Sequence, residues 1–368
     1  MHNKVIRVAQ VIGMAINGGT EALWMNYYNH IDKSKVQFDF LVESTSKIID
    51  REKIESMGGR VVIIPPYTNP FKYMKELKKI FKENNYDIVH SNMSTLSIFV
   101  LRSAKKAGIK VRIAHSHSTS NKKEWKKNIL KNLLRPFSKI YPTHYFACGE
   151  LAGRYLFGNK TFDNGKVAVI NNAIDMDKCR FNLEKRELIR NELGINEEVV
   201  LGHIGRMQAQ KNQSYLIDIF NNYHKLNSNS KLLILGDGPL KETLVNKVNS
   251  LGLTDVVIFA GVKTNPEDYY SAMDCFVLPS LYEGLPVVGI ETQANGLPCY
   301  FANTITEEVK FNDNVYFLPI SVSPKEWAEK IHSSGMVRDN VKENSKYDIK
   351  IQAKMVEEMY KGIVDKII

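Results

Sequence analysis

The stretch Cys275–Pro298, which reads CFVLPSLYEGLPVVGIETQANGLP, decides the fold. Cys275–Leu278 is a short apolar run of the kind that a parallel strand buried on both faces requires. A loop follows, and Pro286 suits the first helical position, because a proline lacks the N–H that would be unpaired there. Gly296 and Pro298 then end the helix. We therefore expect a strand, a loop and a helix in an α/β domain.

The start of this helix would present free N–H groups and the positive end of the helix dipole to an anion. Two carboxylates, Glu283 and Glu291, would repel a phosphate but accept hydrogen bonds from sugar hydroxyls. Glu291 lies about 7.5 Å beyond Pro286 along the helix axis, a reasonable separation between a diphosphate and a ribose. The stretch thus predicts a ligand that carries both phosphate and hydroxyl groups. The expected amide donors are those of Gly284, Leu285, Val287 and Val288.

Glu283 and Glu291 form an E-x7-E pair inside the pattern P-S-x-x-E-G-x-P-x4-E. This pattern resembles the donor-binding signature of the retaining, nucleotide-sugar-dependent glycosyltransferases of GT-B architecture, family 4. The resemblance implies an α/β fold of two Rossmann-like domains with parallel sheets that face each other across a cleft. It implies an acceptor domain at 1–171, a donor domain at 172–348 and a C-terminal helix at 349–368 that crosses back to the first domain. The other interpretation is a surface loop followed by an ordinary helix.

Length and charge agree with two domains. A chain of 368 residues is long for one domain. Residues 1–165 hold 27 Lys and Arg against 13 Asp and Glu, a net charge of +14, whereas residues 166–368 hold 23 against 27, a net charge of −4. Two surfaces with different partners are therefore expected. The four cysteines have no short metal-type spacing, and no run approaches the roughly 20 apolar residues of a membrane span. We expect a cytoplasmic protein, with a peripheral position on the inner face of the membrane as a further option.

The N-terminus predicts a second nucleotide-binding element. Val5–Ile12 reads as a strand, a glycine-rich turn follows, and Glu21–Ile31 has helical spacing. The turn matches neither the G-x-G-x-x-G fingerprint nor a P-loop, which disfavours a cofactor dehydrogenase. Gly18 and Gly19 precede Thr20-Glu21 and resemble the family's GG-x-E loop, which lies under the donor phosphates and the acceptor. A simple tight turn is the alternative.

Two histidines, His115 and His117, fall at the end of an expected strand in R-I-A-H-S-H-S. Ligands of parallel sheets bind at the carboxyl ends of strands, and alternation would place both rings on one side. The family often carries a histidine here, near the transferred sugar, and we favour His117. The alternative is a pair of structural histidines.

Arg206 and Lys211 form an R-x4-K pair after the strand Val199–His203, at the start of a helix. Two cations at this place would neutralise a diphosphate leaving group, as the matching residues do in the family. The resemblance implies catalysis without a metal and without a cofactor, because such a pair of cations can stabilise the leaving group electrostatically.

The segment 121–139 combines apolar residues at helical spacing with basic residues between them. Such a helix is typical of an interfacial membrane anchor on anionic lipid. An amphipathic helix with a core-facing apolar side is the alternative, and nucleic acid is disfavoured because a pattern of aromatic residues interleaved with basic ones for base stacking is not obvious.

Taken together, these motifs predict a retaining hexosyl-type glycosyltransferase of exopolysaccharide or capsule assembly. The donor would be a nucleoside-diphosphate sugar, most readily a UDP-sugar, and the acceptor a saccharide or a lipid-linked oligosaccharide. By resemblance, Arg206 and Lys211 stabilise the leaving diphosphate, while Glu291 holds the ribose. Glu283 orients the sugar, and His117 or His115 contacts it near the reacting carbon. The alternatives are a GT-B nucleotide-sugar 2-epimerase and a non-catalytic sugar-polymer-binding protein.

Overall fold

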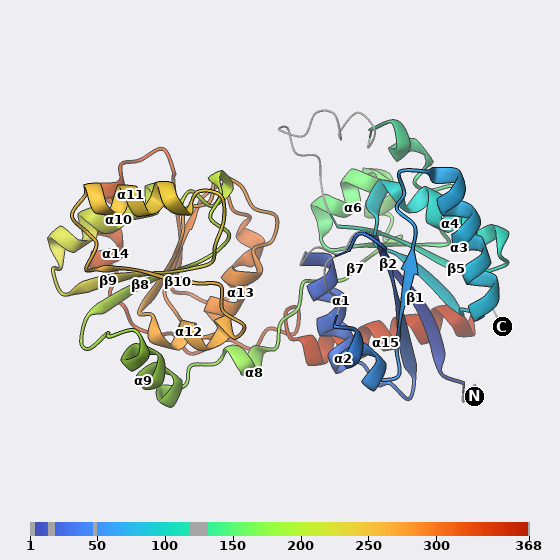
Figure 1. Cartoon of the computed structure of the whole chain (residues 1–368), viewed down its shortest axis with the longest axis horizontal. Helices are drawn as coiled ribbons and strands as arrows, with labels where there is room; N and C mark the ends of the chain where they lie inside the picture. The colour runs from blue at the N-terminus through green and yellow to red at the C-terminus, as the bar shows by residue number, and fades with distance from the viewer. Residues whose placement is uncertain (1–3, 14–18, 47–49, 118–131, 367–368) are drawn as a thin grey trace. The chain divides into compact units, whose positions relative to one another are not determined.

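The computed structural model describes residues 4–13, 19–46, 50–117 and 132–366, and Figure 1 shows that they form two α/β units. The N-terminal unit comprises Met1–Ala173 together with Asp348–Ile368, and the C-terminal unit comprises Ile174–Tyr347. The chain therefore leaves its first unit, builds the second and returns. The expected boundaries, after residues 171 and 348, lie within two residues of these divisions.

The N-terminal unit is built on a seven-stranded parallel sheet of order β3-β2-β1-β4-β5-β6-β7. Its inner strands are almost continuously buried, as a sheet covered on both faces requires. The strands are β1 (Ile6–Gly13), β2 (Val36–Glu43), β3 (Arg60–Ile64), β4 (Ile88–Ser91), β5 (Val111–Ser116), β6 (His144–Ala147) and β7 (Val167–Val169). The helices are α1 (Gly19–His30), α2 (Arg51–Ser56), α3 (Pro70–Asn84), η1 (Ser94–Leu96), α4 (Ser97–Lys106), η2 (Arg135–Phe137), α6 (Glu150–Phe157) and α7 (Asn159–Asp163).

The last helix, α15 (Ile349–Asp365), completes the core of this N-terminal unit. Its buried side chains, among them Ala353, Val356 and Tyr360, share a hydrophobic cluster with Trp24 of α1 and with strands β1 and β2. Figure 1 shows α15 alongside this unit. The expected return of the C-terminal helix is confirmed.

The C-terminal unit is built on a six-stranded parallel sheet of order β10-β9-β8-β11-β12-β13. Two hydrophobic clusters cover its two faces. The strands are β8 (Val199–Ile204), β9 (Ser230–Leu235), β10 (Val257–Gly261), β11 (Cys275–Leu278), β12 (Cys299–Ala302) and β13 (Val315–Leu318). The helices are α8 (Met176–Cys179), α9 (Leu183–Glu192), η3 (Ala209–Lys211), α10 (Gln213–Leu226), α11 (Lys241–Ser250), α12 (Pro266–Ala272), α13 (Val287–Ala294), η4 (Glu307–Val309) and α14 (Pro324–Ser333).

The predicted strand, loop and helix are present as β11 and α13, with one correction. Pro286 is the N-cap and not the first helical residue, because its ψ of 111° is extended. Its carbonyl oxygen accepts a hydrogen bond from the amide of Gly289 at 3.0 Å, which closes the first turn. Gly289 also permits close packing, since a Cβ there would lie 3.1 Å from the ring of Phe301. α13 is thus seated directly on β12.

Candidate functional site

Hydrogen bonds to the turn around Gln210 and Asn212 fix the base of the loop before α13. The amide of Leu281 donates to the carbonyl of Gln210 at 2.8 Å, and the Asn212 side chain donates to the carbonyl of Pro279 at 3.1 Å. A Cβ added to Gly284 would meet nothing within 4 Å, so its backbone borders open space. Within the described part of the chain, four amides of this turn donate no hydrogen bond. They belong to Gly284, Leu285, Val287 and Val288.

Glu283 and Lys211, predicted from separate motifs, form an ion pair. The Lys211 Nζ lies 2.7 Å from Glu283 Oε1, and the side chains are only 15% and 9% exposed. The Gln210 amide also donates to Glu283 Oε2 at 3.3 Å and to the carbonyl of Tyr282 at 2.9 Å. The short helix η3 therefore fixes the orientation of the Glu283 carboxylate.

Arg206 differs from Lys211, because its side chain is exposed and has no hydrogen-bond or ion-pair partner among the described residues. Its backbone is fixed, since its carbonyl accepts a hydrogen bond from Gln213 at 3.0 Å. The turn also packs against the glycine turn after β9: a Cβ at Gly236, where φ is +127°, would lie 2.2 Å from the carbonyl oxygen of Gly205. A rigid backbone thus carries an uncompensated cation at the C-terminal end of β8.

Glu291 lies on the second turn of α13, eight residues after Glu283. The Tyr270 hydroxyl of α12 donates a hydrogen bond to Glu291 Oε2 at 2.6 Å. Burial raises the pKa of the Glu291 carboxyl above its usual value, while the Tyr270 hydrogen bond lowers it and Glu267 raises it. A poorly hydrated carboxylate is a strong acceptor for hydroxyl groups. The structure shows no direct bond between Glu291 and the ion pair of Lys211 and Glu283.

The predicted histidines lie in the N-terminal unit, at the carboxyl end of β5. His115 is fully buried and His117, stacked on it at 4.0 Å between ring centroids, is half-buried. His117 Nε2 lies 2.9 Å from Asn92 Oδ1, and its amide donates to Ser94 Oγ at 3.2 Å. Burial lowers the pKa of His117 to about 3, so its ring is neutral at neutral pH. Because His117 is only half-buried and His115 is fully buried, His117 is the ring of the two that solvent can reach.

Sequence reasoning missed a third histidine, His90 of β4, whose Nε2 lies 3.0 Å from His115 Nδ1. The signal for it was available, because His90 ends an apolar strand just as His115 does. Burial lowers the pKa values of His90 and His115 well below their usual range. The cluster is uncharged and polar.

Two other predictions lie wholly or partly outside the described residues. Gly18 lies outside them, whereas Gly19 is the first residue of α1. The structure describes the basic segment 121–139 only from residue 132 onward. In this part, the side chains of Leu133 and Phe137 are exposed. No helix in the described ranges is both long and apolar enough to cross a membrane.

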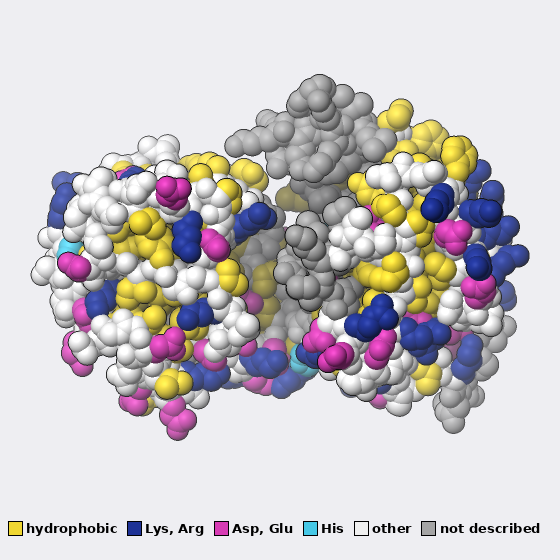
Figure 2. Space-filling view, in the orientation of Figure 1, with side chains coloured by type: hydrophobic (Ala, Val, Ile, Leu, Met, Phe, Trp, Pro, Cys, Tyr) yellow, Lys and Arg dark blue, Asp and Glu magenta, His cyan; other side chains and the backbone are white. Residues whose placement is uncertain are grey.

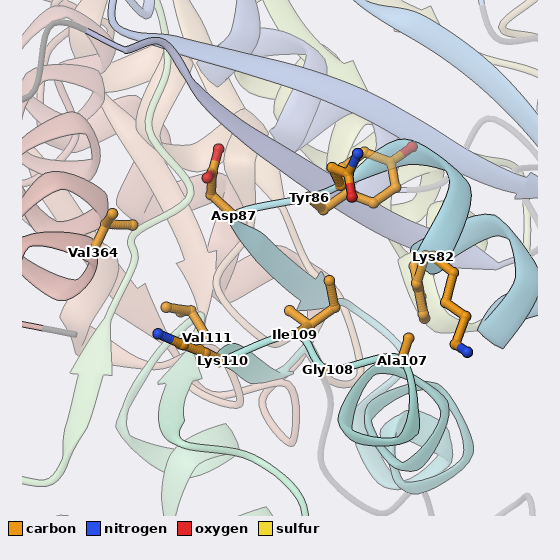
Figure 3. Close-up of a pocket in the computed structure, with 11 residues that line it drawn as sticks. Lys82, Tyr86, Asp87, Ala107, Gly108, Ile109, Lys110, Val111 and Val364 are labelled. Carbon is orange, nitrogen blue, oxygen red and sulfur yellow. The ribbon is translucent and has the colours of Figure 1, made fainter. Parts of the chain in front are cut away.

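A cavity of about 380 Å³, shown in Figure 3, lies at the other edge of the N-terminal sheet. Asp87 and Lys110, which line it, precede β4 and β5, whereas the histidine cluster lies at the opposite, carboxyl ends of these strands. None of the predicted site residues lines this cavity.

Comparison with known proteins gives the same assignment for both units. Residues 17–178 match the family model described as Glycosyltransferase Family 4, and residues 185–346 match the one described as Glycosyl transferases group 1. The relative named glycosyltransferase EpsF, from Bacillus subtilis (strain 168), is 34% identical to this chain. The match covers 90% of this chain and 88% of EpsF.

Two further relatives are each 26% identical. One is a UDP-Gal:alpha-D-GlcNAc-diphosphoundecaprenol alpha-1,3-galactosyltransferase of Escherichia coli, with coverage of 82% of this chain and 80% of the relative. The other is the capsular polysaccharide biosynthesis glycosyltransferase CapH of Staphylococcus aureus, with coverage of 97% and 99%. Among solved structures, Anabaena HepE in complex with UDP superposes with a TM-score of 0.73 at 16% identity, over 98% of both chains.

Proposed function

This chain is a member of family 4 of the GT-B glycosyltransferases, and from this premise we propose which sugar donor and acceptor it uses. The donor is a UDP-hexose, the acceptor is a lipid-linked saccharide, and the anomeric configuration is retained. The product belongs to exopolysaccharide or capsule assembly. The observation that carries the proposal is the turn before α13, where four unpaired amides lie beside the oriented carboxylate of Glu283.

The donor assignment follows from the charges of the C-terminal unit. The amides at the start of α13 offer an anion both hydrogen bonds and the positive helix end. Arg206 adds an uncompensated guanidinium, whose donors match phosphate oxygens. Glu283 and Glu291 supply acceptors for the hydroxyls of the sugar and of the ribose. UDP as the nucleotide is supported by the Escherichia coli galactosyltransferase, which is named for UDP-Gal, and by the HepE structure in complex with UDP.

The chemistry requires charge stabilisation more than a nucleophile. As the bond between the anomeric carbon and the phosphate oxygen breaks, negative charge grows on the diphosphate, and Arg206 with the α13 amides stabilises it. The leaving phosphate then takes the proton of the acceptor hydroxyl on the same face of the sugar, which retains configuration. These groups supply electrostatically what a divalent cation supplies in other enzymes, so we propose catalysis without a metal.

A lipid-linked acceptor is supported by the Escherichia coli relative, which is named for a diphosphoundecaprenol-linked GlcNAc, and capsule assembly is supported by the name of CapH. The N-terminal unit fits such an acceptor, because α3 and α4 pack side by side and expose a row of cations. Figure 2 shows lysine and arginine side chains gathered where these helices lie, along the outer edge of the unit. The exposed cations are Lys72, Lys75, Lys79, Lys82, Arg102, Lys105 and Lys106. We propose that this face, with the basic segment 121–139, rests on an anionic membrane.

Donor binding is tested by thermal unfolding in the presence of UDP, GDP, ADP and the corresponding hexose conjugates. A ligand at 100 times its Kd adds about 2.7 kcal/mol, which raises Tm by several degrees for a unit of this size. UDP and one UDP-hexose should raise Tm, whereas Arg206→Ala should abolish the shift. Lys225→Ala, at an exposed position late in α10, is the matched control and should retain it. A preference for GDP or ADP would contradict the proposed donor.

Transfer is tested by UDP release with and without an undecaprenyl-diphosphate-linked monosaccharide. Release that depends on the acceptor, with a product of the same anomeric configuration as the donor, is expected. Conversion of the UDP-sugar into an epimer without an acceptor would identify the 2-epimerase alternative instead. Binding of the UDP-sugar without any turnover would identify a non-catalytic binding protein.

Membrane association is tested by sedimentation with phosphatidylglycerol vesicles, with phosphatidylcholine vesicles as the control. Two charge reversals to Glu, one of Lys122, Lys123, Lys126 and Lys127 and one of Lys72, Lys75, Lys79 and Lys82, should each weaken sedimentation with the anionic vesicles. Each basic residue near anionic lipid is worth about 1 kcal/mol. Unchanged sedimentation of both variants would contradict the surface proposed here.

A further inference from the structure

A buried side chain with only one hydrogen-bonding role fixes the direction of a hydrogen-bond network in the N-terminal unit. The Trp24 indole N–H can donate but never accept, and it lies 2.6 Å from Asn92 Oδ1. The oxygen of the Asn92 amide is thereby identified, and its Nδ2 must be the donor toward Gln10 Oε1 at 3.0 Å. Trp24 and Gln10 are fully buried and Asn92 nearly so, so water does not compete for these bonds.

The same oxygen decides where the proton of His117 lies. His117 Nε2 is 2.9 Å from Asn92 Oδ1, an oxygen that can only accept, so Nε2 must carry the proton. Because the ring is neutral, Nδ1 carries none. No group in the described chain hydrogen-bonds to this Nδ1, and the ring is half-buried. His117 therefore presents a bare acceptor nitrogen.

The backbone of His117 is anchored by the same turn. Its amide donates to the Oγ of Ser94, two residues after Asn92, at 3.2 Å. Ser94 adopts a φ of +48°, a left-handed conformation that is uncommon for a residue other than glycine. Such a conformation persists only where its surroundings enforce it. Both anchors of His117 thus come from the turn that follows β4.

The remaining bonds give the two buried histidines the same tautomer. Gln10 Nε2 donates to the Tyr360 hydroxyl at 3.0 Å, and that hydroxyl then donates to His90 Nδ1 at 2.7 Å. When the hydroxyl gives its one proton to this nitrogen, His90 carries its own proton on Nε2, from which it donates to His115 Nδ1. The proton of His115 is then on its own Nε2, which is buried and has no partner among the described residues. Trp24 thus sets the direction of the bonds as far as the Tyr360 hydroxyl, and the hydroxyl proton sets it for the two buried histidines.

We propose that Asn92 is a positioning residue for glycosyl transfer, which holds His117 as the Nε2–H tautomer so that its Nδ1 accepts a hydrogen bond from a saccharide hydroxyl. The hydroxyl belongs to a saccharide substrate of the proposed transfer, and in that respect the inference rests on the proposed function. The recognised chemistry is a hydroxyl donor, since a bare imidazole nitrogen accepts and does not donate. With a proton on Nδ1 instead, the bare Nε2 of His117 would face Asn92 Oδ1, and two acceptors would then be opposed.

The tautomers are tested without any ligand by 15N NMR of the full-length protein labelled on its histidine rings. Three rings, those of His90, His115 and His117, should show a protonated Nε2 and a bare Nδ1 at neutral pH, and His117→Gln assigns the third. A protonated Nδ1 on His117, or a charged ring, would overturn the inference. This result does not depend on turnover, so it stands or fails separately from the proposed function.

The positioning role is tested with Asn92→Asp and Asn92→Ala, using UDP release from UDP-galactose or from whichever UDP-hexose raises Tm. The carboxylate that Asn92→Asp introduces still accepts from Trp24 and His117, but its charge raises the pKa of His117. The variant should therefore approach wild-type kcat at high pH and lose activity as pH falls, because a protonated Nδ1 cannot accept. Asn92→Ala should lose about tenfold or more in kcat at every pH.

The matched control is Asn84→Asp, at the end of α3, which should keep the wild-type pH profile. An Asn92→Asp profile parallel to wild type would overturn the positioning role, even if the variant were less stable. If Asn92→Asp does not fold, the ring spectra of the wild-type protein still decide the tautomer. If the wild-type protein releases no UDP from any UDP-hexose, the proposed function fails while the tautomer assignment stands.

Discussion

Replacing Lys211 by methionine keeps an unbranched side chain only one atom shorter but removes the cation from the ion pair with Glu283. The two side chains are only 15% and 9% exposed, so the carboxylate left behind has little access to water. Removing one partner of a buried ion pair typically costs about 3–5 kcal/mol. Because Gln210 still donates to the carboxylate, we expect the lower end, about 3 kcal/mol for Lys211→Met.

The double variant separates the structural role of Lys211 from its role toward the donor. In Lys211→Met with Glu283→Gln, no buried charge remains unpaired, so we expect about 2 kcal/mol of the lost stability to return. Donor binding should not return with it, because Lys211, the second cation of the predicted diphosphate-binding pair, is still absent and only Arg206 is left. Stability should therefore rise from the single to the double variant while donor binding stays weak.

The assay is hydrogen exchange of peptides from β8 and β11, which reports on the C-terminal unit alone, together with the Tm shift produced by UDP. If the free energies of opening from hydrogen exchange in all variants lie within about 0.5 kcal/mol of wild type, the ion pair contributes no more than an exposed pair does, and the reasoning from its burial is refuted. Recovery of UDP binding in the double variant would refute the direct role of Lys211.

Three further variants test other parts of the site. Arg206→Ala should lower kcat/KM by about 100-fold, the cost of losing one preorganised donor at a developing anion, with Tm unchanged and with Lys225→Ala as the control. Glu291→Gln should be more stable than wild type at pH 7 yet less active. Burial raises the pKa of Glu291 above the usual 4.5. The stability of the wild-type protein therefore falls as pH rises from 4.5 through the pKa of the folded state, whereas that of Glu291→Gln does not. The melting curves of the two proteins should converge below pH 4.5. Gly236→Ala should destabilise the unit by about 1–3 kcal/mol and raise the KM for the donor, because its Cβ would collide with the carbonyl of Gly205; equal KM values would contradict this.

The sequence was most informative where a local pattern determines a local structure. The run Cys275–Leu278 and the helix after it are encoded within about 20 residues, and β11 and α13 formed as expected. The error at Pro286 is one residue, because the fixed φ of proline suits both an N-cap and a first helical turn. The elements between Pro298 and α15, among them β12 and β13, were not assigned.

The site could be predicted only in its parts. Lys211 and Glu283 were singled out by separate motifs, but nothing local indicates that they neutralise each other across 72 residues. The network around His117 is less accessible still, because Gln10 and Tyr360 are 350 residues apart and meet only after the chain returns. Periodicity reports which face of an element is apolar, and it carries no information on such pairings.

The return of α15 has a consequence for biosynthesis. Tyr360, which connects Gln10 to His90, is translated only after the 174 residues of Ile174–Tyr347, and at about 5–20 residues per second this takes roughly 10–35 s. During that interval the N-terminal unit lacks the helix that covers Trp24 and Phe38. Trp24 and Phe38 therefore lack part of their apolar cover until α15 is synthesised, and the histidines gain their proton arrangement only when synthesis is nearly over.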